Sequence, residues 1–344
     1  MSQDPTTSTA DFIWCGEVLQ DVSRTFALSV SQLEKPIADE LCIGYLMCRI
    51  ADTIEDATHI PPAEQVRALD QYRRALTPGG DVTVDDFVAD VTPWVPDEAD
   101  PEWELVSNTP RLVATFESLP ASTKAEIRPR IQEMIRGMTL FIDRYADEEG
   151  LRIQTLDELE EYCWYVAGTV GELITGLVTR DRSDGLRSQL METASSFGLL
   201  LQFVNVTKDV ATDYKRENNV YLPEAILAKH GLEHRNIADP GRSDDFAPVI
   251  RELVREAEQY VEDARTWLDV TPECRGNTLG ACALPFLLAV GTLRELKSRP
   301  EDVITEGDVK VSRDEVFAII AAFDGDDTPS LETLQTEVQA GTYR

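Results

Sequence analysis

Basic residues are scarce in this chain. Its 344 residues include 63 Asp and Glu but only 32 Lys and Arg, seven of them lysine, which gives a formal net charge of −31. A surface this acidic repels the phosphates of nucleic acids and of anionic membranes, so neither is expected as a partner. Concentrated salt screens such self-repulsion, and the acids form no single block that would suit a basic partner protein. The composition therefore predicts a cytoplasmic protein of a high-salt organism.

The sequence also has little that could build a disulfide framework, a zinc site or a membrane span. Its six cysteines form no C-x-x-C pair, which predicts free thiols in a reducing compartment. His230 and His234 have the i, i+4 spacing of a zinc pair, but no third ligand lies nearby in the sequence. The N-terminus lacks the basic and apolar regions of a signal peptide. The one long uncharged run, 276–293, contains glycine and proline, so we interpret it as a core helix rather than a transmembrane segment.

Alternating strand patterns are almost absent, with 309–311 as the only short candidate. Apolar residues recur instead at three- and four-residue spacing, which predicts an all-α protein built as a single large helical bundle over residues 11–323. We expect residues 1–10 and the polar tail 324–344 to be mobile, and the acidic stretch 77–104, rich in Pro and Gly, to be a surface loop. The segments with helical spacing are 11–32, 36–57, 63–76, 108–118, 121–145, 155–179, 186–215, 223–230, 245–268, 276–298 and 312–323.

Two pairs of aspartates are candidates for the functional site. Asp52 and Asp56 are separated by four residues, and so are Asp209 and Asp213. On a helix this spacing places both carboxylates of a pair on one face, where they can share a hard cation such as Mg²⁺. With 63 acids in the chain the spacing also arises often by chance, so it decides nothing alone.

The sequence that precedes each aspartate pair sets it apart from the solvated acids. Residues 41–51 contain one charge, and residues 193–207 contain none. Each pair also has a cation within about one turn, Arg49 for the first and Lys208 for the second. Carboxylates and cations at the edge of an apolar interior fit a substrate with a metal-bound diphosphate head and a long apolar tail.

Five stretches, taken in order, resemble the head-to-head prenyl synthases, the squalene and phytoene synthase family. The resemblance covers about residues 12 to 320. The stretches are SRTF (23–26), YLMCRIADTIED (45–56), YCWYVAGTVG (162–171), LQFVNVTKDVATD (201–213) and VYLP (220–223).

The resemblance implies an isoprenoid-synthase bundle in which two aspartate motifs face each other across a central active-site cavity. It also assigns roles to individual residues. Asp52, Asp56, Asp209 and Asp213 would hold Mg²⁺ against a prenyl diphosphate, and Tyr162 would be the proton-handling tyrosine. The diphosphate contacts would be Ser23, Tyr45, Arg49, Gln202, Asn205, Lys208 and Tyr221, with Arg49 and Lys208 also counted as catalytic.

Three positions depart from the family's usual pattern. Thr212 stands where an acid is usual before the final aspartate of the second motif. Lys208 stands where an arginine is usual, and a lysine offers a point charge without the bidentate fork. Asn219 replaces the arginine or glycine expected before VYLP. We expect none of these changes to abolish activity.

The acidic fourth position of DTIED and the stretch 282–297 look more like squalene synthases than phytoene synthases. On that reading the enzyme joins two farnesyl diphosphates via presqualene diphosphate, and NADPH is a cofactor with Asn205 and Lys310 as candidate contacts. The alternatives are a phytoene synthase, which uses two geranylgeranyl diphosphates without NADPH, and a dehydrosqualene synthase. An alternative of a different class is a non-catalytic helical protein that binds divalent cations. We expect a monomer whose only membrane contact is peripheral, for product release.

Overall fold

The computed structural model describes residues 9–98, 100–148, 150–305, 307, 309–323 and 329–344. Over these residues the chain is all-α, as predicted, and the only extended pairing is a single bridge between Arg152 and Val220. The short strand considered for 309–311 does not form. The predicted mobile N-terminus lies outside the described residues up to position 8, and Thr9 already begins a helix.

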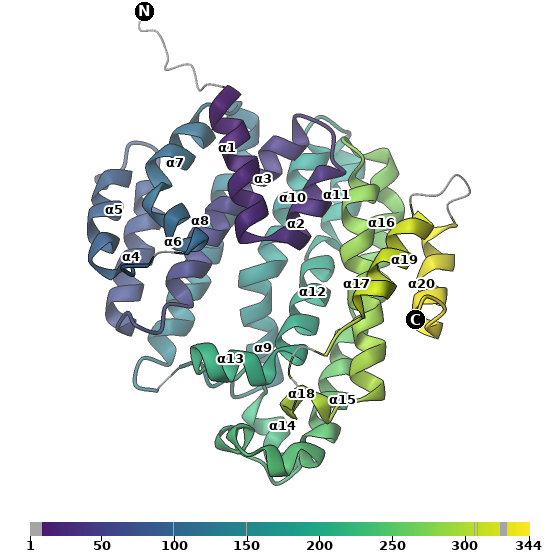
Figure 1. Ribbon diagram of the computed structural model, residues 1–344. Helices are drawn as coiled ribbons and strands as arrows, with labels where there is room; N and C mark the ends of the chain where they lie inside the picture. The colour runs from purple at the N-terminus through teal and green to yellow at the C-terminus, as the bar shows by residue number, and fades with distance from the viewer. Residues whose placement is uncertain (1–8, 99, 149, 306, 308, 324–328) are drawn as a thin grey trace, which may run out of the picture.

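All eleven segments with helical spacing contain helices in the structure (Figure 1). The first part of the chain contains α1 (Thr9–Val22), α2 (Arg24–Ser31), α3 (Ile37–Glu55), α4 (Pro62–Ala75), α5 (Val84–Val91), α6 (Pro101–Ser107), α7 (Thr109–Glu117) and α8 (Ala121–Arg144). The middle contains α9 (Leu156–Cys163), a π-helical turn (Trp164–Gly168), α10 (Thr169–Thr179), α11 (Asp184–Met191), α12 (Ala194–Lys208), α13 (Val210–Glu217) and α14 (Glu224–Lys229). The last part contains α15 (Ser243–Glu258), α16 (Val261–Val270), α17 (Thr278–Ser298), α18 (Asp302–Thr305), α19 (Arg313–Phe323) and α20 (Leu331–Ala340).

The bundle is organised around helices that are buried on most sides. α12 packs against α10, α15, α16 and α17, while α3 packs against α8 and α10. α17 is long and apolar enough to cross a membrane, and it is the one described helix that is. However, 72% of its most apolar 18-residue segment is buried inside the protein, which agrees with its interpretation as a core helix. The six cysteines are free and buried, as expected.

The stretch predicted to be a surface loop, 77–104, instead contains α5 and the start of α6. The side chain of Thr83 and that of Asp86 form a capping box at the start of α5. Phe87 is fully buried, with its ring 4.9 Å from that of Tyr72 in α4. The glycines and prolines that suggested a loop lie at the ends of these short helices, where they are compatible with helix boundaries.

The tail that was expected to be mobile also contains a packed helix. Leu331, Leu334 and Val338 of α20 are buried, and α20 contacts α17. These three apolar residues have the spacing of a single helix face, but the polar residues between them conceal the pattern. Residues 324–328 of the predicted tail lie outside the described residues.

Candidate active site

One stripe of α3 carries four of the predicted site residues. Between positions 41 and 57, the residues that are only partly buried are Tyr45, Arg49, Asp52, Glu55 and Asp56. Their spacing of three and four residues places them one above another on the helix. All the other residues in this range are packed in the core, so only this stripe is available to a ligand.

Arg49 is held at the centre of the stripe by acids on two helices. Its guanidinium lies 3.7 Å from the carboxylate of Asp52 and forms an ion pair with Glu102 of α6. Burial raises the pKa of Asp52 to about 6 even though Arg49 acts in the opposite direction. The single arginine therefore does not balance the negative charge around it.

The start of α2 lies against the upper part of the same stripe. Ser23 is the residue that precedes α2; burial raises the pKa of Tyr45, and interaction with the side chain of Ser23 opposes that rise. The ring of Phe26 stacks on the ring of Tyr45, with centroids 4.0 Å apart and an interplanar angle of 18°. The structure thus brings Ser23 close to Tyr45.

The second motif occupies a matching face of α12 and its continuation. Gln202, Asn205, Lys208 and Asp209 are not buried, whereas the residues at 203, 204, 206 and 207 are. Lys208 forms an ion pair with its neighbour Asp209, at which α12 gives way to α13. Asn205 is exposed on a helix whose other faces are in the core.

The two acidic motifs act on each other electrostatically through Glu217, the last residue of α13. Burial raises the pKa of Asp56 well above its ordinary value, and Glu217 is the next largest cause. Burial and Glu217 also raise the pKa of Asp213 to about 8. Burial raises the pKa of Glu55 to about 8, with Asp52 and then Glu217 adding to the effect. Such shifts mean that negative charge has accumulated in a place where water and cations do not offset it.

A pair of buried tyrosines lies beside this cluster. The hydroxyls of Tyr162 in α9 and Tyr221 are 3.2 Å apart, and their rings are 5.1 Å apart. Burial, together with the charge of Glu55, raises the pKa of Tyr162 well above its ordinary value. Interaction with the Tyr162 hydroxyl in turn opposes the rise in the pKa of Glu55. Both phenols therefore stay protonated in the free protein.

The helix that carries Tyr162 continues through the π-helical turn 164–168, and its glycines allow α12 to approach closely. A β-carbon added at Gly171 would collide with the carbonyl oxygen of Ala194, and one added at Gly198 would collide with that of Ala167. The backbones are therefore in contact at this crossing. π-helical turns such as this one often occur at functional sites.

The donor set of the site fits a hard cation that is shared with a ligand. Among the described residues, no three His, Cys, Asp or Glu side chains come together as a complete metal site. The aspartates instead lie in two pairs with four-residue spacing, and Oε1 of Glu55 is buried without a hydrogen-bond partner in the described part of the chain. Mg²⁺ commonly takes one or two carboxylates and fills its remaining positions with water and phosphate oxygens.

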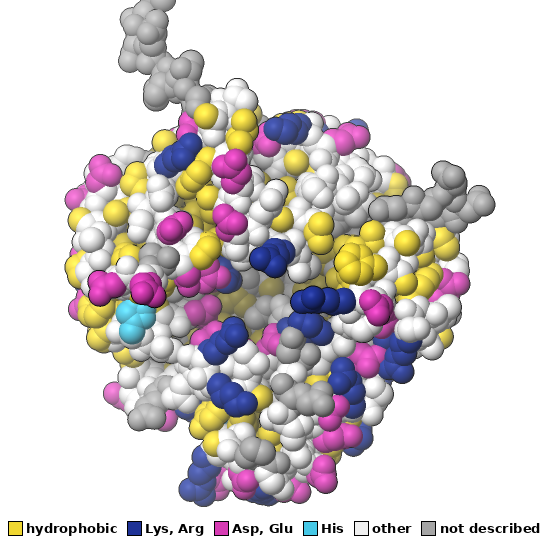
Figure 2. Space-filling view, viewed as in Figure 1, with side chains coloured by type: hydrophobic (Ala, Val, Ile, Leu, Met, Phe, Trp, Pro, Cys, Tyr) yellow, Lys and Arg dark blue, Asp and Glu magenta, His cyan; other side chains and the backbone are white. Residues whose placement is uncertain are grey.

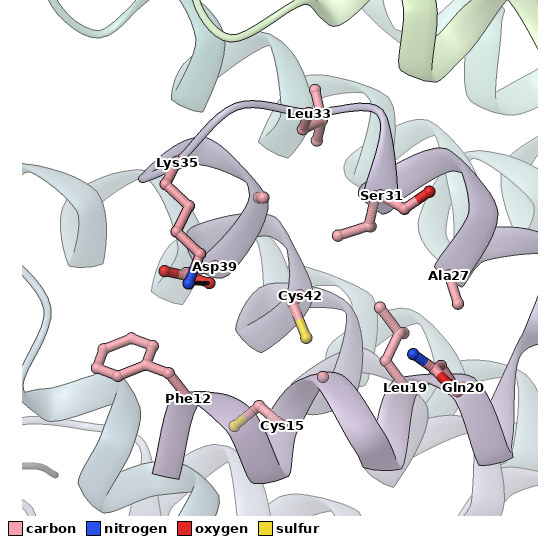
Figure 3. A pocket seen from close by; sticks show the side chains of 13 residues that line it. Phe12, Cys15, Leu19, Gln20, Ala27, Ser31, Leu33, Lys35, Asp39 and Cys42 are labelled. Carbon is pink, nitrogen blue, oxygen red and sulfur yellow. Dashed lines mark ion pairs between the residues drawn. The ribbon is translucent and has the colours of Figure 1, made fainter. Parts of the chain in front are cut away.

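The space for a substrate is visible on one face of the molecule. Figure 2 shows a hollow near the middle of this face, with hydrophobic atoms inside it and several Lys or Arg side chains along its rim. In the same view of Figure 1, α2 lies above this region and α13 below it. A separate pocket of about 270 Å³ lies between α1, α2 and α3, with the ion pair of Lys35 and Asp39 at 3.1 Å (Figure 3). None of the predicted site residues lines that pocket.

The sequence did not point to three of the acids that shape this site. Glu55 lies within the first motif, but the sequence pattern assigns it no role in binding or catalysis. Glu217 continues the i, i+4 series of Asp209 and Asp213, and this spacing could have identified it. Glu102 lies in the stretch interpreted as a loop, so no local signal pointed to it. Lys310 is exposed, and no contact between described residues joins it to Asn205.

Comparison with known proteins shows which family this chain resembles. A model of the family described as squalene/phytoene synthase matches residues 19–315. Squalene synthase 1 of Arabidopsis thaliana is 26% identical over 283 residues, which make up 81% of this chain and 64% of that protein. Squalene synthase of Dictyostelium discoideum is 29% identical over 286 residues, which make up 81% of this chain and 63% of that protein. This chain thus matches less than two thirds of the length of these relatives.

Among solved structures, the complex of TcSQS with the ligand BPH1237 resembles this fold. The TM-score is 0.75 at 22% sequence identity, and the alignment covers 97% of this chain and all of the other. This likeness shows a common all-α fold. Because the family model spans most of the chain and includes both aspartate pairs, the chain belongs to the squalene/phytoene synthase family.

Proposed function

We propose that this protein catalyses the head-to-head condensation of two farnesyl diphosphates, via presqualene diphosphate, to squalene. The observation that carries the proposal is that acids of both motifs are coupled electrostatically to Glu217, with Arg49 and Lys208 beside the motifs and a buried tyrosine pair next to them. The names of the relatives support squalene as the product. A scaffold that only bound divalent cations would not need the tyrosine pair or the hollow.

Asp52, Asp56, Asp209 and Asp213 would hold Mg²⁺, which when bound supplies positive charge to the departing diphosphate. Arg49 and Lys208 add fixed positive charge at the same place. Both are already held close to the aspartates, so little reorganisation is needed when pyrophosphate leaves. Ser23, Tyr45, Gln202 and Asn205 are donors on the two facing stripes and orient the diphosphate; Tyr221 acts beside Tyr162.

Departure of pyrophosphate leaves an allylic cation, and the apolar interior of the hollow keeps water away from it. The double bond of the second chain attacks this cation. A C–H bond then breaks, and its electrons close the three-membered ring of presqualene diphosphate. The proton goes to Oη of Tyr162 as the phenol's own proton passes to the facing carboxylate of Glu55.

Reduction of presqualene diphosphate to squalene consumes a hydride, which NADPH supplies when it is bound. Asn205 is exposed on the face of α12 that carries the second motif, and it would contact this cofactor. Lys310 follows the short helix α18, which packs against α13, and its exposed side chain would bind a phosphate of NADPH. We propose that the enzyme works as a cytoplasmic monomer, with peripheral membrane contact for release of the product.

Identification of the product tests the proposal directly. The protein is incubated with farnesyl or geranylgeranyl diphosphate, Mg²⁺ and high salt, with and without NADPH, and the hydrocarbon is identified by mass spectrometry. We expect squalene from farnesyl diphosphate only when NADPH is present. A C40 product, or a farnesyl-derived product unaffected by NADPH, would contradict the squalene assignment. Binding of Mg²⁺ without release of pyrophosphate from either substrate would favour the non-catalytic alternative.

A further inference from the structure

Asn219 connects the tyrosine pair to the rest of the fold, and its amide orientation is fixed. The residue is 7% exposed and lies just after α13. Its Oδ1 accepts a hydrogen bond from the backbone N–H of Leu151 at 2.9 Å. Because a backbone N–H can only donate, this contact identifies Oδ1 as the acceptor and Nδ2 as the donor. Nδ2 lies 3.3 Å from the hydroxyl of Tyr221 and 3.4 Å from a carboxylate oxygen of Glu217.

The donor at Asn219 sets the direction of the hydrogen bonds that follow. The oxygen of Tyr221 accepts from Asn219, so the hydroxyl hydrogen of Tyr221 needs its own acceptor. Among the described residues, the one acceptor within hydrogen-bonding distance is Oη of Tyr162, at 3.2 Å. In the opposite direction, this buried hydrogen would have no acceptor in the described part of the chain, which costs about 1–3 kcal/mol.

The direction of this hydrogen bond determines the orientation of the Tyr162 hydroxyl group. Its oxygen accepts one hydrogen bond from Tyr221, so its hydrogen points away from Tyr221, and Glu55 is a neighbouring carboxyl group that interacts with this hydroxyl. One lone pair of the Tyr162 oxygen is left in a fixed direction. A phenol without this constraint rotates its hydrogen between several orientations.

We propose that Asn219 is a positioning residue that acts through Tyr221 to orient the hydroxyl of Tyr162 for proton transfer. The inference rests on the proposed function, in which Tyr162 receives the substrate proton. It also gives a role to a residue that first appeared as a departure from the family's usual pattern. Asn219 does not reach the diphosphate, because both ends of its amide are used within the protein.

The test uses Asn219→Asp, which preserves the size of the side chain and the acceptor for Leu151 but removes the donor to Tyr221. We expect kcat for the coupled product to fall about tenfold with KM unchanged within twofold, and more farnesol to form per pyrophosphate released. Tyr221→Phe should produce the same fall, because it removes the same link. In the double variant the two effects should not add, since both interrupt a single chain of contacts.

Asn218→Asp is the matched control, because it introduces the same negative charge one residue away. Asn218 is bonded to Arg152 and adopts a left-handed backbone conformation that aspartate tolerates. Its kcat should stay within twofold of the wild type. Wild-type kcat in Tyr221→Phe would overturn the inference, even if Asn219→Asp failed to fold. Additive losses in the double variant, or a change in KM alone, would also overturn it. If the wild type itself formed no coupled product, the proposed function would fail instead.

Discussion

The pKa values of buried carboxylates are shifted in opposite directions in two charged clusters of this protein. The first, which we call the active-site acid cluster, consists of Asp52, Glu55, Asp56, Asp213 and Glu217, and the pKa of each member is raised. The second, which we call the C-terminal ion-pair cluster, consists of Arg294, Glu295, Glu315 and Arg344. In this second cluster Glu315 is 1% exposed and receives two hydrogen bonds of 2.7 Å from Arg294.

The difference lies in how the negative charge is balanced. Burial raises the pKa of Glu295, but hydrogen bonds from Arg344 and Arg294 outweigh burial, and the pKa is lowered overall. In the active-site acid cluster, burial and neighbouring acids together outweigh Arg49. In the C-terminal ion-pair cluster the acids are paired with arginines of the protein, and these ion pairs join α17 to α19 and α20. Charges that it leaves unbalanced are available to cations from outside, which is the pattern expected of a functional site.

The largest effect that would distinguish the clusters is loss of turnover. Asp52→Asn or Asp209→Asn should lower turnover about a thousandfold, because on the proposed function each variant removes charge that would hold the cation and diphosphate of the transition state. The helical content should be unchanged, because these side chains lie on stripes that do not pack in the core. Pyrophosphate release from farnesyl diphosphate and far-ultraviolet circular dichroism measure the two quantities.

Asp147→Asn is the control for this loss, since it removes one carboxylate from an exposed position outside both clusters. It should leave turnover unchanged. If both site variants released pyrophosphate at the wild-type rate, the assignment of the site would be wrong.

The C-terminal ion-pair cluster should respond in stability rather than activity. Glu315→Gln should lower the free energy of unfolding by about 2 kcal/mol, because the guanidinium of Arg294 loses the counter-charge of Glu315 while it retains that of Glu295. Urea titration at high salt measures this change. The activity per folded molecule should remain at the wild-type level.

Lys35→Ala provides the comparison for that loss. Lys35 is 74% exposed and pairs with Asp39 at 3.1 Å, and an ion pair in solvent contributes less than about 1 kcal/mol. A loss for Glu315→Gln no larger than that for Lys35→Ala would show that burial does not strengthen the C-terminal pair.

The smallest of the three effects is a dependence of stability on pH. The ordinary pKa of an aspartate carboxyl is 3.8, and in the fold the pKa of Asp213 is raised to about 8. Between these values the folded protein binds a proton that the unfolded chain does not, so raising the pH across this range lowers the free energy of unfolding. Without Mg²⁺, stability should therefore fall from about pH 4 to pH 8, and Asp213→Asn should reduce the fall by about 1 kcal/mol.

Thermal unfolding at a series of pH values and constant high salt measures this dependence. Addition of Mg²⁺ at the upper end should restore stability in the wild type more than in Asp213→Asn, because a ligand that binds the folded form stabilises it. Glu295 contributes in the opposite sense, since its lowered pKa gives stability that is lost only at low pH. A wild type whose stability rises from about pH 4 to pH 8 would contradict the charge assignment of the active-site acid cluster.

Most of the fold could be predicted because helical periodicity is local. The stripe of Tyr45, Arg49, Asp52 and Asp56 follows from their positions along one helix, and the buried residues between them follow from the same pattern. Local pattern failed for α5 and α20, which are short helices. They span only 8 and 10 residues, and acids or other polar residues interrupt their apolar positions.

Only those contacts of the site that lie within a single motif could be predicted from the sequence. The ion pair of Arg49 with Glu102 joins residues 53 positions apart, and nothing local to either residue indicates it. Asn219 illustrates the same limit. The sequence shows only that an expected residue is missing, whereas its role depends on Leu151 from a different part of the chain.

The contact between the backbone of α12 and that of the tyrosine-bearing helix limits how this enzyme could be redesigned. Gly171 and Gly198 have no room for a β-carbon. Larger side chains at these positions would push the two helices apart and displace Tyr162 relative to Asp209. Attempts to fit longer or shorter prenyl chains should therefore alter other walls of the hollow. The distance between Tyr162, the proposed base, and Asp209, a proposed metal ligand, would then stay constant.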